Sequence, residues 1–225
     1  MILTFDEEKH RYRLDGIEVP SVSELLTPIT AAGYEKISPE TLRIAAERGT
    51  EVHEACEALD YGLDPDDISE DVEPYLDAYT LFLSEHNIEW LGIEDMGACA
   101  GHKYYTTDYA GTVDRWGYID GELCVVDIKT YASPTTEQKC AVALQTAAYE
   151  GILATKHPEL ENGFRHYALF LKKDGKYRLF DLDAFAEKEG FAVQEMLRNL
   201  TTSYCCKRYV ADTVNEIKDA RRRKK

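Results

Sequence analysis

The sequence has little positive charge: 26 lysine and arginine residues stand against 42 aspartate and glutamate residues, which gives a formal net charge of −16. Such an acidic chain is not suited to coating nucleic acid, because non-specific attraction to phosphate needs a cationic surface. A local basic groove is still compatible with this total. Residues 218–225 form one compact basic run, which either frays as a solvated tail or contacts phosphate.

Long apolar runs are also missing. No stretch reaches the length of a membrane span, and no early stretch joins a basic start to an apolar run. We therefore expect a cytoplasmic protein with no membrane partner. The hydrophobic content of 44% and charged content of 30% are typical of a globular chain, and 225 residues suffice for a single domain with a substantial core.

Paired cysteine spacings are the third absence. None of the six cysteines forms a CxxC pair; they stand at positions 56, 99, 124, 140, 205 and 206. Zinc and iron–sulfur sites normally use such paired spacings, so we expect no iron–sulfur cluster. Disulfides are rare in a reducing cytosol, and we expect the cysteines to be buried thiols.

The most informative stretch that is present spans residues 111–130. Asp120-Gly121 is a strong signal for a two-residue hairpin turn, and apolar strand-forming residues flank it on both sides. If these two residues form the turn, Trp116 lies opposite Val125 and Asp114 lies opposite Asp127. The sequence therefore predicts two antiparallel strands that bring two carboxylates face to face.

This pair of carboxylates needs a compensating charge. Directly opposed residues have Cβ atoms about 4.5–5.5 Å apart, and like charges at that separation destabilise a sheet. Lys129 follows Asp127 by two positions and so projects from the same face. A divalent cation is the natural compensator, and hard oxygen ligands suit Mg²⁺ or Mn²⁺ better than zinc or copper.

Two predicted helices carry the remaining candidate residues. The first spans residues 38–60, with Ser38 as its N-cap and Tyr61-Gly62 at its end, and it places His53 and Glu57 on one face. The second spans residues 136–155 and places Gln145 and Tyr149 four positions apart beside an apolar stripe. From the residues alone, each of these side chains is equally well explained as ordinary helix surface.

The other expected elements complete an α/β pattern. They are a hairpin at residues 2–19, a short helix from residue 24 to residue 27 ended by Pro28, a helix at 71–87, strands beginning near Trp90 and at 164–170 and 176–182, a strand or its approach at 101–109, and a helix at 183–200. No internal repeat, low-complexity segment or second-domain boundary interrupts this order.

The motifs together resemble the PD-(D/E)XK nuclease superfamily, and within it the RecB-like exonucleases, many of them encoded by phages. The resemblance is carried by Gly111-Thr112-Val113-Asp114, Asp127-Ile128-Lys129, Gln145 with Tyr149, and the upstream Arg48-Gly49-Thr50 with His53. The first acidic motif of the superfamily survives here only as Val113-Asp114.

The resemblance implies a fold and a division of the single domain, residues 1–225. The fold is a restriction-endonuclease-like α/β core, a central mixed β-sheet flanked by helices, in residues 90–182. An N-terminal hairpin and short helix (1–35) and C-terminal helices with the basic tail (183–225) are added to this core.

The resemblance also implies roles for individual residues. Asp114, Asp127, the backbone carbonyl of Ile128 and His53 would hold Mg²⁺ or Mn²⁺, and Glu94 matches the position of a further acid that reaches the metal. Lys129 would orient the attacking water, or take its proton if its own pKa is depressed. Gln145 and Tyr149 would orient Lys129 or the substrate.

The expected function is metal-dependent hydrolysis of DNA phosphodiester bonds, by an exonuclease rather than an endonuclease, in phage-type recombination or repair. DNA is the expected partner, a single-strand annealing protein or a recombinase is a further candidate, and a homo-oligomer is compatible with the family. Two alternatives stay open: a catalytically idle member of the same fold that binds DNA or a recombinase, and a metal-dependent phosphohydrolase of small molecules.

Overall fold

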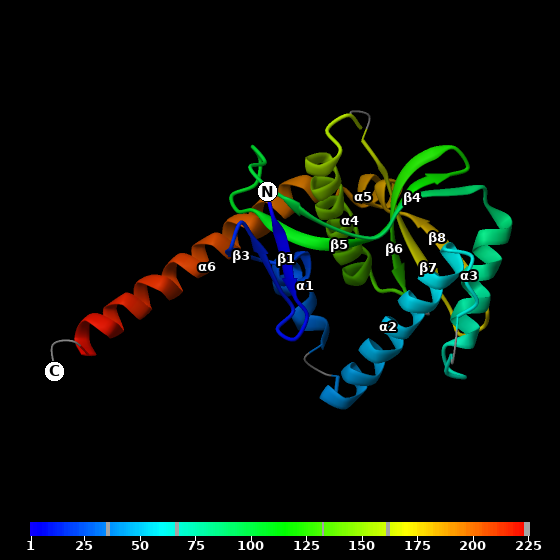
Figure 1. The fold of residues 1–225 in the computed structure, drawn as a ribbon, viewed down its shortest axis with the longest axis horizontal. Coiled ribbons are helices and arrows are strands. Elements are labelled where there is room, and N and C mark those ends of the chain that lie inside the picture. The colour runs from blue at the N-terminus through cyan, green and yellow to red at the C-terminus, as the bar shows by residue number, and fades with distance from the viewer. Residues whose placement is uncertain (35–36, 66–67, 132, 161–162, 223–225) are drawn as a thin grey trace.

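A computed structural model describes residues 1–34, 37–65, 68–131, 133–160 and 163–222. Its main sheet has five strands in the order β4-β5-β6-β7-β8, and it is mixed, because β6 and β7 run parallel while the other neighbours are antiparallel (Figure 1). The strands are β4 (Ile88–Cys99), β5 (Tyr109–Ile119), β6 (Glu122–Lys129), β7 (Arg165–Leu171) and β8 (Tyr177–Asp181). The α/β class with a mixed sheet flanked by helices is confirmed.

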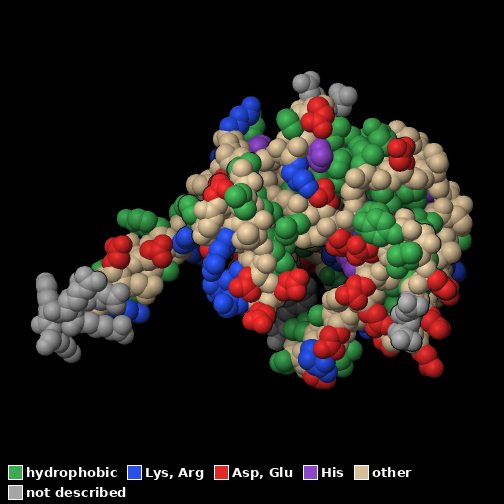
Figure 2. Space-filling model, viewed as in Figure 1, with side chains coloured by type: hydrophobic (Ala, Val, Ile, Leu, Met, Phe, Trp, Pro, Cys, Tyr) green, Lys and Arg blue, Asp and Glu red, His purple; other side chains and the backbone are tan. Residues whose placement is uncertain are grey.

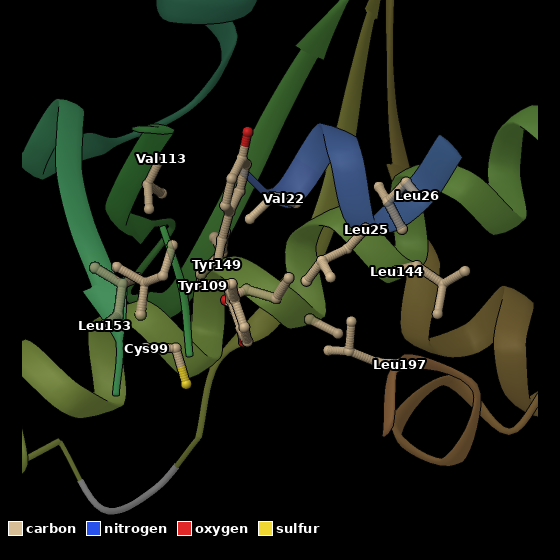
Figure 3. Packing of buried hydrophobic residues seen from close by; sticks show 14 of the residues in the cluster. Val22, Leu25, Leu26, Cys99, Tyr109, Val113, Leu144, Tyr149, Leu153 and Leu197 are labelled. Carbon is tan, nitrogen blue, oxygen red and sulfur yellow. Dashed lines mark hydrogen bonds between the residues drawn. The ribbon is translucent and has the colours of Figure 1, made fainter. Parts of the chain in front are cut away.

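Helices cover both faces of this sheet. On one face lie α1 (Val22–Tyr34), α4 (Thr136–Lys156) and the start of α6 (Val193–Arg222), which share one buried apolar cluster with β5 and β6. Figure 3 shows side chains of α1 beside Tyr149 and Leu144 of α4 in this cluster. On the other face lie α2 (Pro39–Asp60) and α3 (Glu73–Glu85), which bury a second cluster against β6 and β7.

The predicted central hairpin is confirmed. Asp120 and Gly121 both have positive φ, 52° and 86°, as a turn of this kind requires. The register pairs Trp116 with Val125, and the regular ladder ends at Arg115, opposite Val126. Local turn chemistry therefore fixes which side chains of β5 and β6 share a face.

The N-terminal segment forms a separate antiparallel sheet of three strands, β1 (Leu3–Asp6), β2 (Arg11–Leu14) and β3 (Ile17–Val19). The predicted hairpin is thus extended by one strand after the turn at Asp15-Gly16. The sheet packs on β4 and β5 through a small buried cluster that includes Tyr12 and Ala110. The Tyr12 hydroxyl also hydrogen-bonds the Thr112 hydroxyl at 3.2 Å, which ties the sheet to β5.

The prediction that a short helix ends at Pro28 is wrong, because α1 continues to Tyr34. Its start is fixed by a reciprocal cap, in which Ser21 Oγ accepts from the Glu24 amide and Glu24 accepts from the Ser21 amide. Pro28 removes one helical hydrogen bond. The burial of Leu25 and Leu26, just before Pro28, outweighs the loss.

Two further boundaries differ from expectation. Residues 101–108 form turns rather than a strand, and β5 begins at Tyr109. The single helix predicted over 183–200 is two helices, because Gly190 takes a left-handed φ of 64° and ends α5 (Leu182–Glu189). The next helix, α6, has 30 residues and extends away from the body of the molecule toward the C-terminus (Figure 1).

The long helix α6 packs on the body of the molecule through its first half. Leu197 and Leu200 are buried in the cluster shared with α4, and Arg208 donates to the backbone oxygen of Glu18 at 3.1 Å, whereas Tyr209 and Val210 are exposed. Of the predicted basic run, Lys218 lies on this helix, residues 223–225 lie outside the described residues, and the side chains of 219–222 are not described.

The cysteines are only partly buried, which corrects the expectation that all six are. Cys56, Cys99 and Cys124 are buried, Cys140 and Cys205 are half-buried, and Cys206 is exposed on α6. In the described part of the chain, no helix is both long and apolar enough to cross a membrane.

His166 connects β7 to α4 and α5 by ion pairs. Its Nδ1 lies 2.9 Å from Asp183 of α5 and its Nε2 lies 3.4 Å from Glu150 of α4. Burial lowers the pKa of His166, but hydrogen bonds to Asp183 and Glu150 outweigh burial and raise this pKa from 6.5 to about 9. The protonated ring therefore stabilises the folded state.

We expect this contribution to stability to depend on pH. Because the folded pKa of His166 is the higher one, the contribution is complete below about pH 6.5 and is lost as the pH rises through about 9. Its size is at most about 3 kcal/mol. Urea unfolding at about pH 6 and about pH 10 should show the stability difference between wild type and His166→Gln shrink at the higher pH. A difference that stays constant would contradict the charged role of His166.

Candidate active site

The predicted site residues meet at the end of the hairpin that lies away from its turn. His53 of α2, Glu94 of β4 and Asp114 of β5 each offer a ligand atom, and these atoms all lie within 4.8 Å of one another. His53 Nδ1 is 3.3 Å from Glu94 Oε1 and 3.8 Å from Asp114 Oδ2. His53 Nε2 is 3.1 Å from the backbone oxygen of Ile128. Three elements and the end of β6 thus converge on one point.

Asp114 lies where the regular pairing of β5 is interrupted on both sides. Toward β4, the ladder passes from Arg115 directly to Val113, and toward β6 it stops at Arg115. The predicted pairing of Asp114 with Asp127 is therefore not part of the ladder. Instead, Asp114 Oδ2 accepts a hydrogen bond of 2.8 Å from the amide of Ile128, which fixes this buried carboxylate beside the end of β6.

Glu94 is held in an unusual backbone conformation. Its φ is +43°, a region that residues with a side chain other than Asn or Asp enter rarely and at a cost. The carboxylate is held by Arg115, whose Nη1 donates to Oε1 at 3.0 Å, and by His53. Strain of this kind gathers at functional sites, which supports a role for Glu94. Glu57 is not part of the cluster of described ligand atoms.

Asp127 and Lys129 form an ion pair beside this cluster, with Lys129 Nζ 2.7 Å from Asp127 Oδ2. The Asp127 side chain is fully buried, and its Oδ1 has no hydrogen-bond partner among the described residues. Burial raises the pKa of Asp127 to about 7, and Asp114 adds to this effect while Lys129 opposes it. Asp127 lies outside the group of three ligand atoms, next to Lys129.

Lys129 keeps its proton. Burial lowers its pKa, but Asp127 and Asp114 outweigh burial and raise the pKa above the ordinary lysine value. The notion that Lys129 takes a proton from water because of a depressed pKa is therefore not supported. The ammonium is instead available to donate hydrogen bonds and to attract negative charge.

Gln145 and Tyr149 of α4 lie on the same side of the sheet as these groups. Gln145 Nε2 donates to the Tyr149 hydroxyl at 2.8 Å. Burial raises the pKa of Tyr149 well above its usual value, and Asp114 and Asp127 add to the effect. The phenol of Tyr149 therefore stays neutral, and it lies near Asp114 and Asp127. Gly111 allows Val22 of α1 to pack closely on β5 here, since a Cβ at this position would lie 3.0 Å from Val22.

The donor set fits a hard divalent cation. Two carboxylates, one imidazole and one backbone carbonyl converge, and oxygen-rich sites of this composition suit Mg²⁺ or Mn²⁺. Burial lowers the pKa of His53, but Asp114 and Glu94 outweigh burial and raise it, so the site already favours positive charge at this point. The unpartnered Asp127 Oδ1 is a further buried acceptor close by.

A pocket of about 300 Å³ opens onto the cluster, lined by Glu94, Asp114 and Tyr149 together with residues of the N-terminal sheet and the start of α1. Figure 2 shows the surface hollowed between the N-terminal part of the chain and α2. Nothing in the sequence indicates that the N-terminal strands border the site. Phe5, His10 and Tyr12 line this pocket.

Arg115 is a second residue that the sequence did not single out. Its guanidinium is fully buried and binds Asp60 at 2.6 Å, Glu94 at 3.0 Å and the backbone oxygen of Asp114 at 2.6 Å. Asp60 lies at the end of α2 and also accepts from Tyr79 and Trp90. The only sequence signal for Arg115 is its position directly after Asp114. The pairing with Asp60 arises from the fold.

Comparison with known proteins adds no relative: no protein-family model matches the chain, and no curated protein matches it significantly. What the site can do therefore has to be argued from its own geometry.

Proposed function

We propose that this protein is a Mg²⁺- or Mn²⁺-dependent DNA exonuclease of the RecB-like branch of the PD-(D/E)XK superfamily, with a restriction-endonuclease-like core. The observation that carries this proposal is the convergence of His53, Glu94 and Asp114 beside the buried Asp127–Lys129 pair. His53, Asp114, Asp127 and Lys129 come from the motifs that carry the superfamily resemblance, and Glu94 matches the position of a further acid in the family. The mixed sheet with helices on both faces is compatible with the proposed core.

The chemistry divides between a metal and the chain. A bound divalent ion supplies Lewis acidity, which activates water and neutralises charge on the phosphoryl oxygens. His53, Glu94, Asp114 and the Ile128 carbonyl would hold it. Lys129 donates hydrogen bonds that orient the attacking water and stabilise the phosphorane-like transition state. Asp127 fixes the position of Lys129 through their ion pair.

A cluster of cations on the same face of the sheet supports an extended anionic substrate. Lys129 lies beside Phe170 of β7, which lies beside Arg178 of β8. Arg178 and Lys139 lie over the ring of Phe180 at 4.8 and 5.3 Å from its centroid, and both line a cavity of about 440 Å³ with Lys188 and with two acids, Asp181 and Glu189. Cations interleaved with an aromatic ring suit a nucleic-acid strand, in a chain whose total charge is strongly negative.

Part of the surface near the site is acidic. Figure 2 shows acidic side chains over α2 and over the segment that leads into α3. Because these regions repel phosphate, DNA contact there is disfavoured, and the site and the cation cluster are the regions that favour it. We propose DNA as the partner on this basis. An annealing protein or recombinase remains a further candidate partner that no contact in the structure addresses.

One assay tests the proposed function and both alternatives. Linear and circular DNA of equal length are incubated with Mg²⁺, with Mn²⁺ and with EDTA. We expect the linear DNA to be degraded in a metal-dependent reaction and the circle to be spared. Cleavage of the circle would indicate an endonuclease. DNA binding without cleavage would indicate an idle member of the fold, and release of phosphate from small esters alone would indicate a small-molecule phosphohydrolase.

A further inference from the structure

The pocket over the candidate metal site is lined by aromatic rings as well as by acids. Phe5 and Tyr12 have ring centroids 4.5 Å apart, and the His10 ring lies edge-on to Phe5 at 5.1 Å. All three line the same pocket as Glu94 and Asp114. A patch of π-faces and a group of acids thus share one cavity.

The aromatic patch is held against β5, the strand that carries Asp114. Tyr12 is buried with Ala98 of β4 and Ala110 of β5, and its hydroxyl bonds Thr112, two positions before Asp114. Phe5 is half-buried beside it, while His10 is exposed in the turn between β1 and β2. The rings are therefore fixed relative to Asp114, as a binding surface requires.

The size and chemistry of the pocket suit one nucleotide. A volume of about 300 Å³ is at the small end of ligand sites in proteins and has no room for a duplex. Aromatic side chains bind nucleobases by stacking with little regard to sequence. Glu94 and Asp114, which line the same pocket, would hold the metal that contacts the phosphate.

We propose that Phe5 and His10, positioned by the buried Tyr12, form a stacking subsite for the base of the terminal nucleotide, next to the scissile phosphate. This inference rests on the proposed nuclease function and adds to it how an end is recognised. A pocket that holds a single unpaired base selects a frayed strand end, because a base inside a duplex would first have to leave its stack.

A binding measurement tests the subsite without catalysis. The probes are the 5′- and 3′-monophosphates of 2-aminopurine deoxyriboside, whose fluorescence falls on stacking, titrated with the full chain in Mg²⁺. We expect saturable quenching of at least one isomer. His10→Ala and Phe5→Leu should bind it about 5-fold or more weakly, since each base–aromatic contact contributes substantially. Tyr209→Ala, an exposed aromatic on α6, is the matched control and should bind like wild type.

A second measurement separates this inference from the proposed function. Linear DNA with an intact or an abasic terminal nucleotide is cleaved by wild type and by His10→Ala. Wild type should cleave the abasic end about 5-fold or more slowly than the intact end, and this ratio should be smaller in His10→Ala, in which only Phe5 is left to stack on the base. Because His10 is exposed, its removal should leave folding intact even if Phe5→Leu does not fold.

The outcomes are distinguishable. No quenching of either isomer, or equal binding by wild type and His10→Ala, would overturn the subsite while leaving DNA cleavage as evidence for the nuclease. Quenching that His10→Ala weakens, in a protein that cleaves no DNA, would overturn the proposed nuclease function and support the nucleotide subsite.

Discussion

Lys129→Ala should lose most of the hydrolysis of linear DNA, by about 100-fold or more in kcat, while still binding Mg²⁺ or Mn²⁺. The reason is that Lys129 is the cation that we propose to contact the reacting phosphate, and removing one preorganised donor to a transition state costs about 10²–10³ in rate. His53, Glu94 and Asp114, which would hold the metal, form their contacts with one another without Lys129. Initial rates and metal titration by calorimetry measure the two effects separately.

The matched control is Lys173→Ala, in the exposed turn between β7 and β8. It removes the same charge from the chain and should keep wild-type rates. Turnover that survives in Lys129→Ala would rule out its catalytic role. Loss of metal affinity in the same variant would mean that Lys129 acts mainly by holding the site together through Asp127.

Arg115→Met should destabilise the protein by about 3–5 kcal/mol, the cost of leaving a buried charge without its partner. Arg115 and Asp60 are both almost completely buried and lie 2.6 Å apart. Without the guanidinium, Asp60 would keep its bonds from Tyr79 and Trp90 but lose its counter-charge. Urea unfolding measures the change, and Arg13→Met on the exposed side of β2 should change stability by less than about 0.5 kcal/mol.

A second substitution tests whether charge is the cause. In Arg115→Met with Asp60→Asn, position 60 keeps an oxygen that accepts hydrogen bonds but carries no charge. This double variant should be more stable than Arg115→Met alone. If the double variant loses as much stability as the two single substitutions together, the uncompensated carboxylate is not the cause of the loss in Arg115→Met. The cause is then the lost packing of the arginine side chain.

The features that could be predicted from the sequence are those set by local chemistry. The hairpin register follows from Asp120-Gly121, because the turn fixes the pairing of the strands it joins. The start of α2 follows from the Ser38 cap, which bonds the Thr41 amide. His53 was expected at the metal only through its resemblance to a family motif, and it does lie beside Asp114.

The features that could not be predicted depend on contacts between distant segments. Pro28 would end an isolated helix, but α1 gains more from burial than it loses in hydrogen bonding. Arg115 becomes a buried link only once α2 brings Asp60 to it. The N-terminal aromatics reach the site because the small sheet docks on β5. None of these contacts leaves a periodic pattern in the sequence.

The extension of α6 affects how the size of this protein is judged in solution. A helix of 30 residues is about 45 Å long, and its second half lies clear of the core (Figure 1). A molecule with such a projection tumbles and diffuses more slowly than a sphere of equal mass. Early elution from a gel-filtration column is thus the expected behaviour of one copy, and counting subunits calls for a method that reads mass independently of shape.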